Sequence, residues 1–402
     1  MPDETLHWRR NMYVCLFGSF TNVTAMTLVL PFLPIYVEHL GVQGHAAIVQ
    51  WSGIAYGIPF LGAGLLAPLW GKMADLYGRK LILIRASLAM AICMSLIGVA
   101  QDIYQLVGLR LLAGLLGGYA SGAVVLVATQ TPKEHSGWAL GTLSTGAMAG
   151  TLLGPLIGGV LPGLIGIRAT FFLAGGVIFL AFLATTLLIH EDRQHLQPGV
   201  RRVTRGAWSM IPDRRPVIAM LTTAMLLMLA NMSIEPIITV YVGQLMPPGG
   251  DVVFTAGLVM AASAVGSVLA APRLGRMADR IGHWNLIIIC LLACGVLLIP
   301  QAFVSNSWEL IGLRFLMGVA LAGLLPAIGA TIRHSVPHGA AGTILGYNTS
   351  AQYAGQVLGP LAGGFVGGHV GMRAVFLATT LIMFGGAAFN WIITRQVIRP
   401  AT

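Results

Sequence analysis

Glu235 is the one acid that the sequence places deep inside a long apolar stretch. The other twelve of the 13 Asp and Glu residues fall in polar loops, in the tails or at the ends of apolar runs. The next residue is Pro236, which lacks an N–H group, kinks a helix and frees a backbone carbonyl nearby. Burial favours the protonated form of a carboxyl, as a proton carrier requires, so Glu235 is a candidate for proton coupling. The alternative is a permanently protonated glutamate that bonds the freed backbone.

Two arginines, Arg110 and Arg314, also lie within apolar runs, each 35 residues after an aspartate. A charge in hydrocarbon is costly unless it is paired, hydrated or extended to the interface. Each arginine is therefore either a functional group that faces a polar interior, or a structural group that reaches the interface or bonds backbone carbonyls of a neighbouring helix.

A short charged motif occurs twice in the chain. Residues 71–79 read Gly-Lys-Met-Ala-Asp-Leu-Tyr-Gly-Arg, and residues 275–283, which lie 204 positions later, read Gly-Arg-Met-Ala-Asp-Arg-Ile-Gly-His. We expect Asp75 and Asp279 in tight turns, where a carboxylate can accept hydrogen bonds from the free N–H groups of a helix N-terminus. Alternatively, both aspartates balance the neighbouring Arg79 and Arg280 locally.

The composition indicates a membrane protein. Only 9% of the 402 residues are charged and 56% are hydrophobic, whereas a soluble domain carries about 25% charged residues. The net charge of +10 does not indicate nucleic-acid binding, because no soluble basic domain is present to carry it. Cys290 and Cys294 share a helix face without a nearby histidine or acid, so we expect no metal site and no cofactor.

Twelve apolar runs are long enough to span a bilayer, which takes about 20 residues each. We expect helices near 11–37, 46–70, 80–100, 104–130, 137–162, 168–190, 216–245, 252–272, 284–303, 307–331, 340–367 and 372–394. The runs are continuous rather than alternating, which excludes a β-barrel. With both termini in the cytoplasm, 19 of the 23 Lys and Arg residues fall on the cytoplasmic side and only Arg168 and Arg373 on the other, as the positive-inside rule requires.

The chain divides into two similar halves. The polar stretch 191–215 separates six spans from six, so we expect helical bundles at 1–190 and 216–402 with a membrane-surface linker between them, in preference to a regulatory domain. Gly150-x-x-x-Gly154-Pro155-Leu-Ile-Gly158-Gly159 matches residues 355–364. Because each half has an even number of spans, the copies share one orientation and are related by an axis along the membrane normal.

These motifs carry a family resemblance over almost the whole chain. The 71–80 segment resembles the signature loop of the major facilitator superfamily, Arg110-x-x-x-Gly114 resembles its fourth-span motif, and residues 150–159 resemble its antiporter motif. Residues 31–36 and 136–144 are similar to the MdtG-like multidrug exporters within the drug:proton antiporter group. Leu76 departs from the arginine that is usual there, and His283-Trp284 replace the basic pair of the second copy.

The resemblance implies a cytoplasmic gate. Asp75 would dock near Gly339 in the other half, and Asp279 near Ser136, holding the cytoplasmic side shut. The gate residues would be Gly71, Asp75, Gly78, Arg79, Lys80, Gly275, Asp279, Arg280 and Gly282. The antiporter motif would comprise Gly150, Gly154, Pro155, Gly158 and Gly159. The resemblance also implies that Arg110 faces the central cavity and takes part in proton coupling, and Arg314 is its duplicate.

A substrate cavity is expected at the midplane between the halves. Polar, aromatic or methionine residues that could line it, each equally able to serve packing alone, are Asn22, Met26, Trp51, Tyr56, Tyr119, Asn231, Gln352, Tyr353 and Gln356. Methionines and aromatics with few charges favour varied amphiphilic molecules over a sugar or peptide.

Transport is therefore the expected function, namely proton-coupled efflux of drug-like or amphiphilic molecules across a bacterial inner membrane by a monomer. The alternative within transport is a dedicated carrier of one metabolite, such as a siderophore or sugar. An enzyme would need acids, histidines or serines gathered together, and the ten histidines lie mostly in loops or at span ends. A receptor would need a soluble output domain, and direct ATP use would need a phosphate-binding motif that the sequence does not contain.

Overall fold

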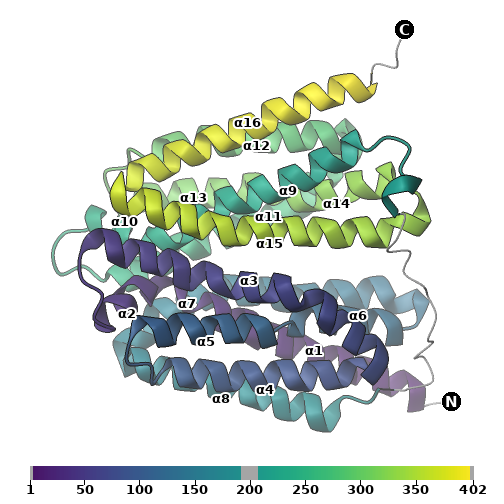
Figure 1. Cartoon of the computed structure of the whole chain (residues 1–402), viewed down its shortest axis with the longest axis horizontal. Coiled ribbons are helices and arrows are strands. Elements are labelled where there is room, and N and C mark those ends of the chain that lie inside the picture. The colour runs from purple at the N-terminus through teal and green to yellow at the C-terminus, as the bar shows by residue number, and fades with distance from the viewer. Residues whose placement is uncertain (1–2, 192–206, 399–402) are drawn as a thin grey trace. The chain divides into compact units, whose positions relative to one another are not determined.

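Every element of the described chain is a helix (Figure 1). The computed structural model describes residues 3–191 and 207–398, except the side chains of residues 3–6, 75, 207, 338–339 and 397–398. The first repeat contains α1 (Asp3–Thr27), η1 (Leu30–Phe32), α2 (Leu33–His39), α3 (His45–Tyr77), α4 (Arg79–Ile97), α5 (Ile103–Leu116), α6 (Tyr119–Gln130), η2 (Lys133–His135), α7 (Ser136–Ile165) and α8 (Ile167–Leu188). After η4 (Ala207–Met210), the second repeat contains α9 (Arg215–Ile234), η5 (Glu235–Ile237), α10 (Ile238–Leu245), α11 (Val252–Ile281), α12 (His283–Gln301), α13 (Ser307–Leu321), α14 (Leu324–Ser335), α15 (His338–His369) and α16 (Met372–Ile398).

The predicted spans coincide with these helices. Eleven described segments are long and apolar enough to cross a membrane, and several are built from two consecutive helices, such as α5 with α6. The twelfth predicted span is α15, a single helix of 32 residues. It falls outside the eleven because polar side chains such as Gln352 and Gln356 lower its hydropathy. The all-α class expected from the sequence is confirmed.

The charged motifs are helical rather than looped, which corrects the expectation of tight turns around the two aspartates. Helix α3 continues to Tyr77 and α11 to Ile281, so both aspartates lie in a last helical turn. Each helix ends at a glycine with positive φ, +93° at Gly78 and +88° at Gly282. The N–H group of Gly78 donates to the carbonyl of Ala74 at 3.1 Å, as helix-terminating glycines do. No residue before the glycine interrupts the helix, so the connection shrinks to one residue.

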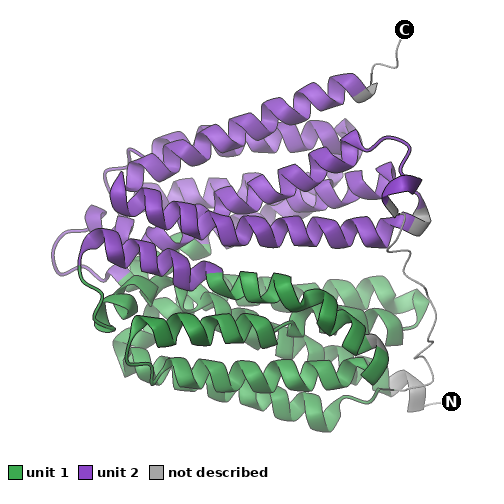
Figure 2. Ribbon diagram, in the orientation of Figure 1, with its two compact units in different colours: residues 1–43, 58–200, 253–261 green, residues 44–57, 201–252, 262–402 purple. Residues whose placement is uncertain are grey.

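The described chain forms two compact units (Figure 2). The first falls within residues 1–43, 58–200 and 253–261, and the second within 44–57, 201–252 and 262–402. Each unit thus consists mainly of one sequence repeat and takes a short helical segment from the other. The boundaries expected at 190 and 216 stay a prediction, because part of the segment between them lies outside the described residues.

The two units repeat the same side-chain contacts. In the first unit the Tyr36 hydroxyl donates to the carbonyl of Ile97 at 2.5 Å, and its ring packs on Phe171. In the second unit Tyr241 donates to the carbonyl of Gln301 at 2.8 Å and packs on Phe376. Corresponding residues of the two contacts stand 204 or 205 positions apart, so the internal repeat seen in the sequence is also present in the side-chain contacts.

The antiporter-motif glycines bring helix backbones together. A Cβ at Gly158 of α7 would overlap the backbone of Leu28 beside α1, and one at Gly154 would overlap Thr27. Helix α7 turns its other side to the start of α11, where Gly257 lies against the carbonyl of Pro155 and Gly159 lies near Phe254. Such small residues allow close backbone approach in membrane helices. In this structure the motif is therefore a packing stripe with two faces.

We predict that Gly158→Ala lowers the midpoint of thermal unfolding in detergent by several degrees, because the added methyl group meets backbone that cannot move aside. Overpacking of this kind costs about 1–3 kcal/mol. Gly163→Ala on the same helix is the matched control, since a Cβ there meets nothing within 4 Å. Equal unfolding midpoints for the two variants would show that the α1–α7 contact is looser than described.

Candidate functional site

The site is built where the first helix of the second repeat breaks. Helix α9 ends at Ile234, and the turn η5 carries Glu235 and Pro236 before α10 begins at Ile238. Proline cannot donate the hydrogen bond that would continue α9, which is why the break falls there. The first repeat breaks in the same way at Pro31 in η1. The predicted proline kink beside Glu235 is thus present.

Glu235 and Arg314 form an ion pair inside the second unit. The Oε1 atom of Glu235 lies 3.7 Å from the Nη2 atom of Arg314 on α13. The arginine side chain is fully buried, and the glutamate side chain is 14% exposed. The tertiary structure thus joins two residues that the sequence indicated separately and that stand 79 positions apart.

Arg314 depends on this carboxylate for compensation of its charge. Its Nε, Nη1 and Nη2 atoms are buried without a hydrogen-bond partner among the described residues. A buried charge that loses its only counter-ion is strongly destabilising. Protonation of Glu235 would leave the guanidinium in that condition, so the state of the carboxyl group controls the electrostatic balance of the whole site.

Arg110 occupies the matching place on α5 and is only 2% exposed. It is therefore buried within the first unit and is not extended to the protein surface. The residue that matches Glu235, 205 positions earlier, is Leu30 in η1. The first unit thus repeats the buried arginine and the proline break without the acid. The role of Arg110 in proton coupling stays a prediction.

Two methionines extend the site along the face of α9 that leads to Glu235. Met228 and Met232 precede Glu235 by seven and three residues, a spacing that places side chains on one helix face. The Tyr56 hydroxyl lies 3.5 Å from the sulfur of Met232, and Nε2 of Gln356 lies 3.6 Å from the sulfur of Met228. All these residues belong to the second unit. Two predicted cavity residues thus contact the methionines that precede Glu235 in the chain.

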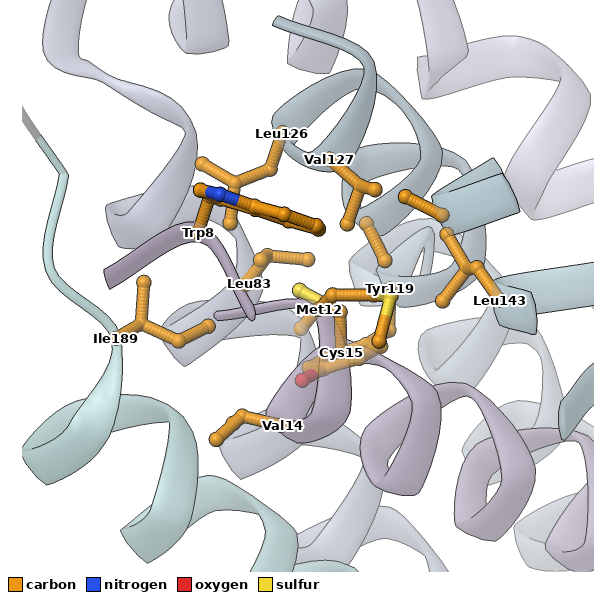
Figure 3. Close-up of a cluster of buried hydrophobic side chains, with 13 residues drawn as sticks. Trp8, Met12, Val14, Cys15, Leu83, Tyr119, Leu126, Val127, Leu143 and Ile189 are labelled. Carbon is orange, nitrogen blue, oxygen red and sulfur yellow. The ribbon is translucent and has the colours of Figure 1, made fainter. Parts of the chain in front are cut away.

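The other cavity candidates differ in their surroundings. Tyr119 packs in a hydrophobic cluster with Trp8 and Cys15 (Figure 3), and its hydroxyl bonds Thr185 at 2.8 Å. The amide of Asn22 donates to the carbonyl of Gly18 one turn away. Both side chains are buried and hydrogen-bonded within the first unit, and a place in the substrate cavity stays a prediction for each. Half-buried positions are held by Met26, Trp51, Asn231, Gln352 and Tyr353.

The first charged motif is tied to its own unit through α4. The Arg79 side chain bonds the Thr129 hydroxyl on α6. The backbone N–H groups of Arg79 and Lys80 donate to the two carboxylate oxygens of Glu191 at 2.7 and 2.9 Å. Gly71 and Gly275, in contrast, have open space where a Cβ would lie.

The predicted docking of the two aspartates stays a prediction. The side chains of Asp75 and of its expected partner residue Gly339 lie outside the described residues. For Asp279 and Ser136, the two residues belong to different units. The local alternative, in which Arg79 balances Asp75, is likewise not tested, because the Asp75 side chain lies outside the described residues.

Sequence reasoning missed Met228, Met232 and Glu191 as members of these sites. The seven-residue and three-residue spacing to Glu235 could have indicated the methionines. No local signal could have indicated Glu191, because its partners stand more than 110 positions away. Among the described residues, no group of three or more His, Cys, Asp or Glu side chains could hold a metal ion.

Comparisons with known proteins agree with this architecture. The family model of the Major Facilitator Superfamily matches residues 15–249 and 250–401. The multidrug resistance protein MdtG of Proteus mirabilis is 42% identical over 388 residues, covering 96% of both chains. The MdtG protein of Escherichia fergusonii is 42% identical over 398 residues, covering 99% of this chain and 98% of its own.

A solved structure shows the same fold. The bacterial homologue of the human lysosomal transporter Spinster, in an inward-facing and unoccupied conformation, superimposes with a TM-score of 0.76 over the full length of both chains, at 15% identity. The matched family and fold are those of membrane transporters and not of enzymes. With a family model matched in both repeats and relatives above 40% identity over nearly the whole chain, this protein belongs to the Major Facilitator Superfamily.

Proposed function

We propose that this chain exports drug-like or amphiphilic small molecules from the cytoplasm in exchange for protons. The relatives that carry the name multidrug resistance protein match nearly its full length, which supports efflux. The observation that carries proton coupling is the Glu235–Arg314 pair, a buried arginine compensated by a single protonatable group.

The pair supports coupling because its two states differ in charge. With Glu235 ionised, the site is close to neutral. With Glu235 protonated, it holds a net positive charge in a medium where an uncompensated charge is costly. Binding or release of one proton by Glu235 therefore changes the net charge of the site, as an exchange mechanism requires.

The methionine face suggests how a substrate would affect the same carboxylate. Met228 and Met232 are flexible and polarisable, a property that suits ligands of varied shape. A molecule resting on them would lie next to Glu235 on the same helix face. Substrate and proton would then oppose each other at Glu235, so each would leave as the other binds.

The expected setting is a bacterial inner membrane with both termini in the cytoplasm, where most of the Lys and Arg residues would lie. A monomer suffices, since one chain contains both repeats. The halves at 1–190 and 216–402 would rock about the central site, as parallel-repeat transporters do, with residues 191–215 as their linker. The gate at the two charged motifs would close the cytoplasmic side.

Flux into proteoliposomes with an imposed pH gradient tests this proposal. We expect a gradient-dependent flux of several chemically unrelated amphiphiles and collapse of that flux when an ionophore removes the gradient. Flux that ignores the gradient would rule out proton coupling. Saturable flux of a single metabolite would instead favour a dedicated carrier.

A further inference from the structure

The segment that follows α8 is fastened to the first unit at three consecutive residues. Ile189 is buried in a hydrophobic cluster with Trp8, Met12 and Leu83 (Figure 3). His190 and Glu191 then make the polar contacts described below. Three consecutive anchored residues are unusual at the end of a helix, where a chain commonly becomes loose.

Asn11 of α1 holds the backbone of His190 on both sides. Its Nδ2 atom donates to the carbonyl of His190 at 2.6 Å, and its Oδ1 atom accepts the N–H group of His190 at 3.0 Å. The same Nδ2 atom also donates to Oε1 of Gln130 at 2.6 Å. Asn11 is buried, and the hydrogen bonds of its amide group join α1, α6 and the segment after α8.

Glu191 follows the residue that Asn11 binds, and it caps the N-terminus of α4, more than 110 positions earlier in the chain. Gly78 precedes α4 and provides no side-chain cap. The carboxylate of Glu191 accepts the N–H groups of both Arg79 and Lys80, which would otherwise lack an intrahelical acceptor. A carboxylate at a helix N-terminus is also favoured by the helix dipole. A Cβ at Gly78 would lie 2.7 Å from Oε2 of Glu191, so the glycine also leaves room for the cap.

Among the described residues of the second unit, no side chain caps the start of α12 in this way. The residue that matches Glu191, 205 positions later, is Gln396, which is exposed on α16. Gly282 again has positive φ, but the ring of the following His283 contacts His334 on α14, 5.7 Å between centroids. The second copy thus ties its helix start to α14 as the first ties Arg79 to α6. Only the first copy adds an acid that follows the sixth span.

We propose that Glu191 is a positioning residue for the transport cycle. It holds the start of α4, and with it the one-residue connection at Gly78 that follows the turn of α3 containing Asp75. In the exporter proposed above, on which this inference rests, the gate residues Gly78, Arg79 and Lys80 lie at this connection and at the start of α4. Glu191 would therefore set the rate of gate movement without touching the substrate.

Two measurements on the full-length protein test this role. Hydrogen–deuterium exchange followed by mass spectrometry reports on the peptide that contains Arg79 and Lys80. Export from proteoliposomes, measured with a fluorescent amphiphilic dye, gives the maximal rate and the half-saturating concentration. For Glu191→Ala we expect faster exchange of that peptide by about fivefold, the typical effect of losing a helix cap. We expect a several-fold lower maximal rate at an unchanged half-saturating concentration.

Two further variants make the result specific. Glu191→Gln keeps one acceptor oxygen and should fall between wild type and Glu191→Ala in both measurements. Gln396→Ala, at the matching place of the second copy, should leave both unchanged. Faster exchange with a wild-type maximal rate would reduce Glu191 to a structural cap, and unchanged exchange would overturn the proposal altogether. If the wild-type chain exported no dye, the proposed function would fail, while the exchange result would still decide whether Glu191 holds the connection.

Discussion

Replacing Glu235 with glutamine is expected to abolish gradient-driven export while leaving a folded protein in the membrane. Glutamine has the size of glutamate and keeps an acceptor oxygen in the side chain, but it cannot release a proton at any working pH. The proposed cycle passes through a protonated Glu235, which the amide imitates, so the fold must tolerate this neutral state. The flux of dye against its concentration gradient should fall to the flux measured in protein-free liposomes.

The measurement needs a control that separates coupling from binding. Counterflow, in which labelled substrate exchanges for unlabelled substrate without a gradient, should persist in Glu235→Gln because the site remains present. Glu38→Gln replaces an exposed acid at the end of α2 and should transport like wild type. Gradient-driven uphill export by Glu235→Gln at the wild-type rate would end the assignment of Glu235 as the proton carrier.

The two partners of the ion pair are expected to differ strongly in what their loss does to stability. Glu235→Leu leaves the Arg314 guanidinium buried without a counter-ion, and arginine keeps its charge under all ordinary conditions. Removing one partner of a buried pair costs about 3–5 kcal/mol. Arg314→Leu instead leaves a glutamate that can become neutral by binding a proton, so the loss of stability should be clearly smaller.

Thermal unfolding of the purified variants checks this asymmetry. We expect the lowest midpoint for Glu235→Leu and a higher one for Arg314→Leu. The double variant should recover much of the loss, because replacing both charges with apolar groups removes the buried charge entirely. Independent, additive losses from the two single variants would show that the residues do not act as a pair.

Transport should not follow stability in this series. Arg314→Leu removes the charge that makes protonation of Glu235 costly. Export by this variant should therefore become indifferent to the pH gradient, although the variant should be more stable than Glu235→Leu. Glu235→Gln and Arg314→Leu would then share a functional defect while differing in stability. A gradient-driven rate in Arg314→Leu close to that of wild type would place the coupling group elsewhere, with Arg110 as the next residue to test.

Much of the fold follows from local properties of the chain. Runs of about 20 apolar residues must be helical in a bilayer, because the backbone has no other way to satisfy its hydrogen bonds there. The helix boundaries near Gly78 and the breaks at Pro31 and Pro236 also follow from single residues with restricted or unusual backbone geometry. The polarity of the charged motifs predicts turns there, but polarity at a membrane surface does not prevent a helix from continuing.

The candidate site could be predicted only in part. Glu235, Arg314 and Arg110 were identifiable singly, since an ionisable residue within an apolar span is unusual wherever it lies. Tyr119 resembled a cavity residue for the same kind of reason, yet it packs in the core with its hydroxyl on Thr185. The sequence shows that a residue is a tyrosine but does not show whether it lines a cavity or packs in the core, because its neighbours come from other helices.

The sequence by itself determined that this protein is a membrane transporter of two repeats, because hydropathy, internal duplication and motif spacing are all properties of the linear chain. Only the tertiary structure decided which charges meet. It placed Glu235 of η5 beside Arg314 of α13, left Leu30 at the matching position of the first unit, and set Glu191 on the start of α4. The physical reason is that charge–charge and capping interactions act over a few ångströms. Only the packing of helices brings residues that stand 79 or 112 positions apart within that distance.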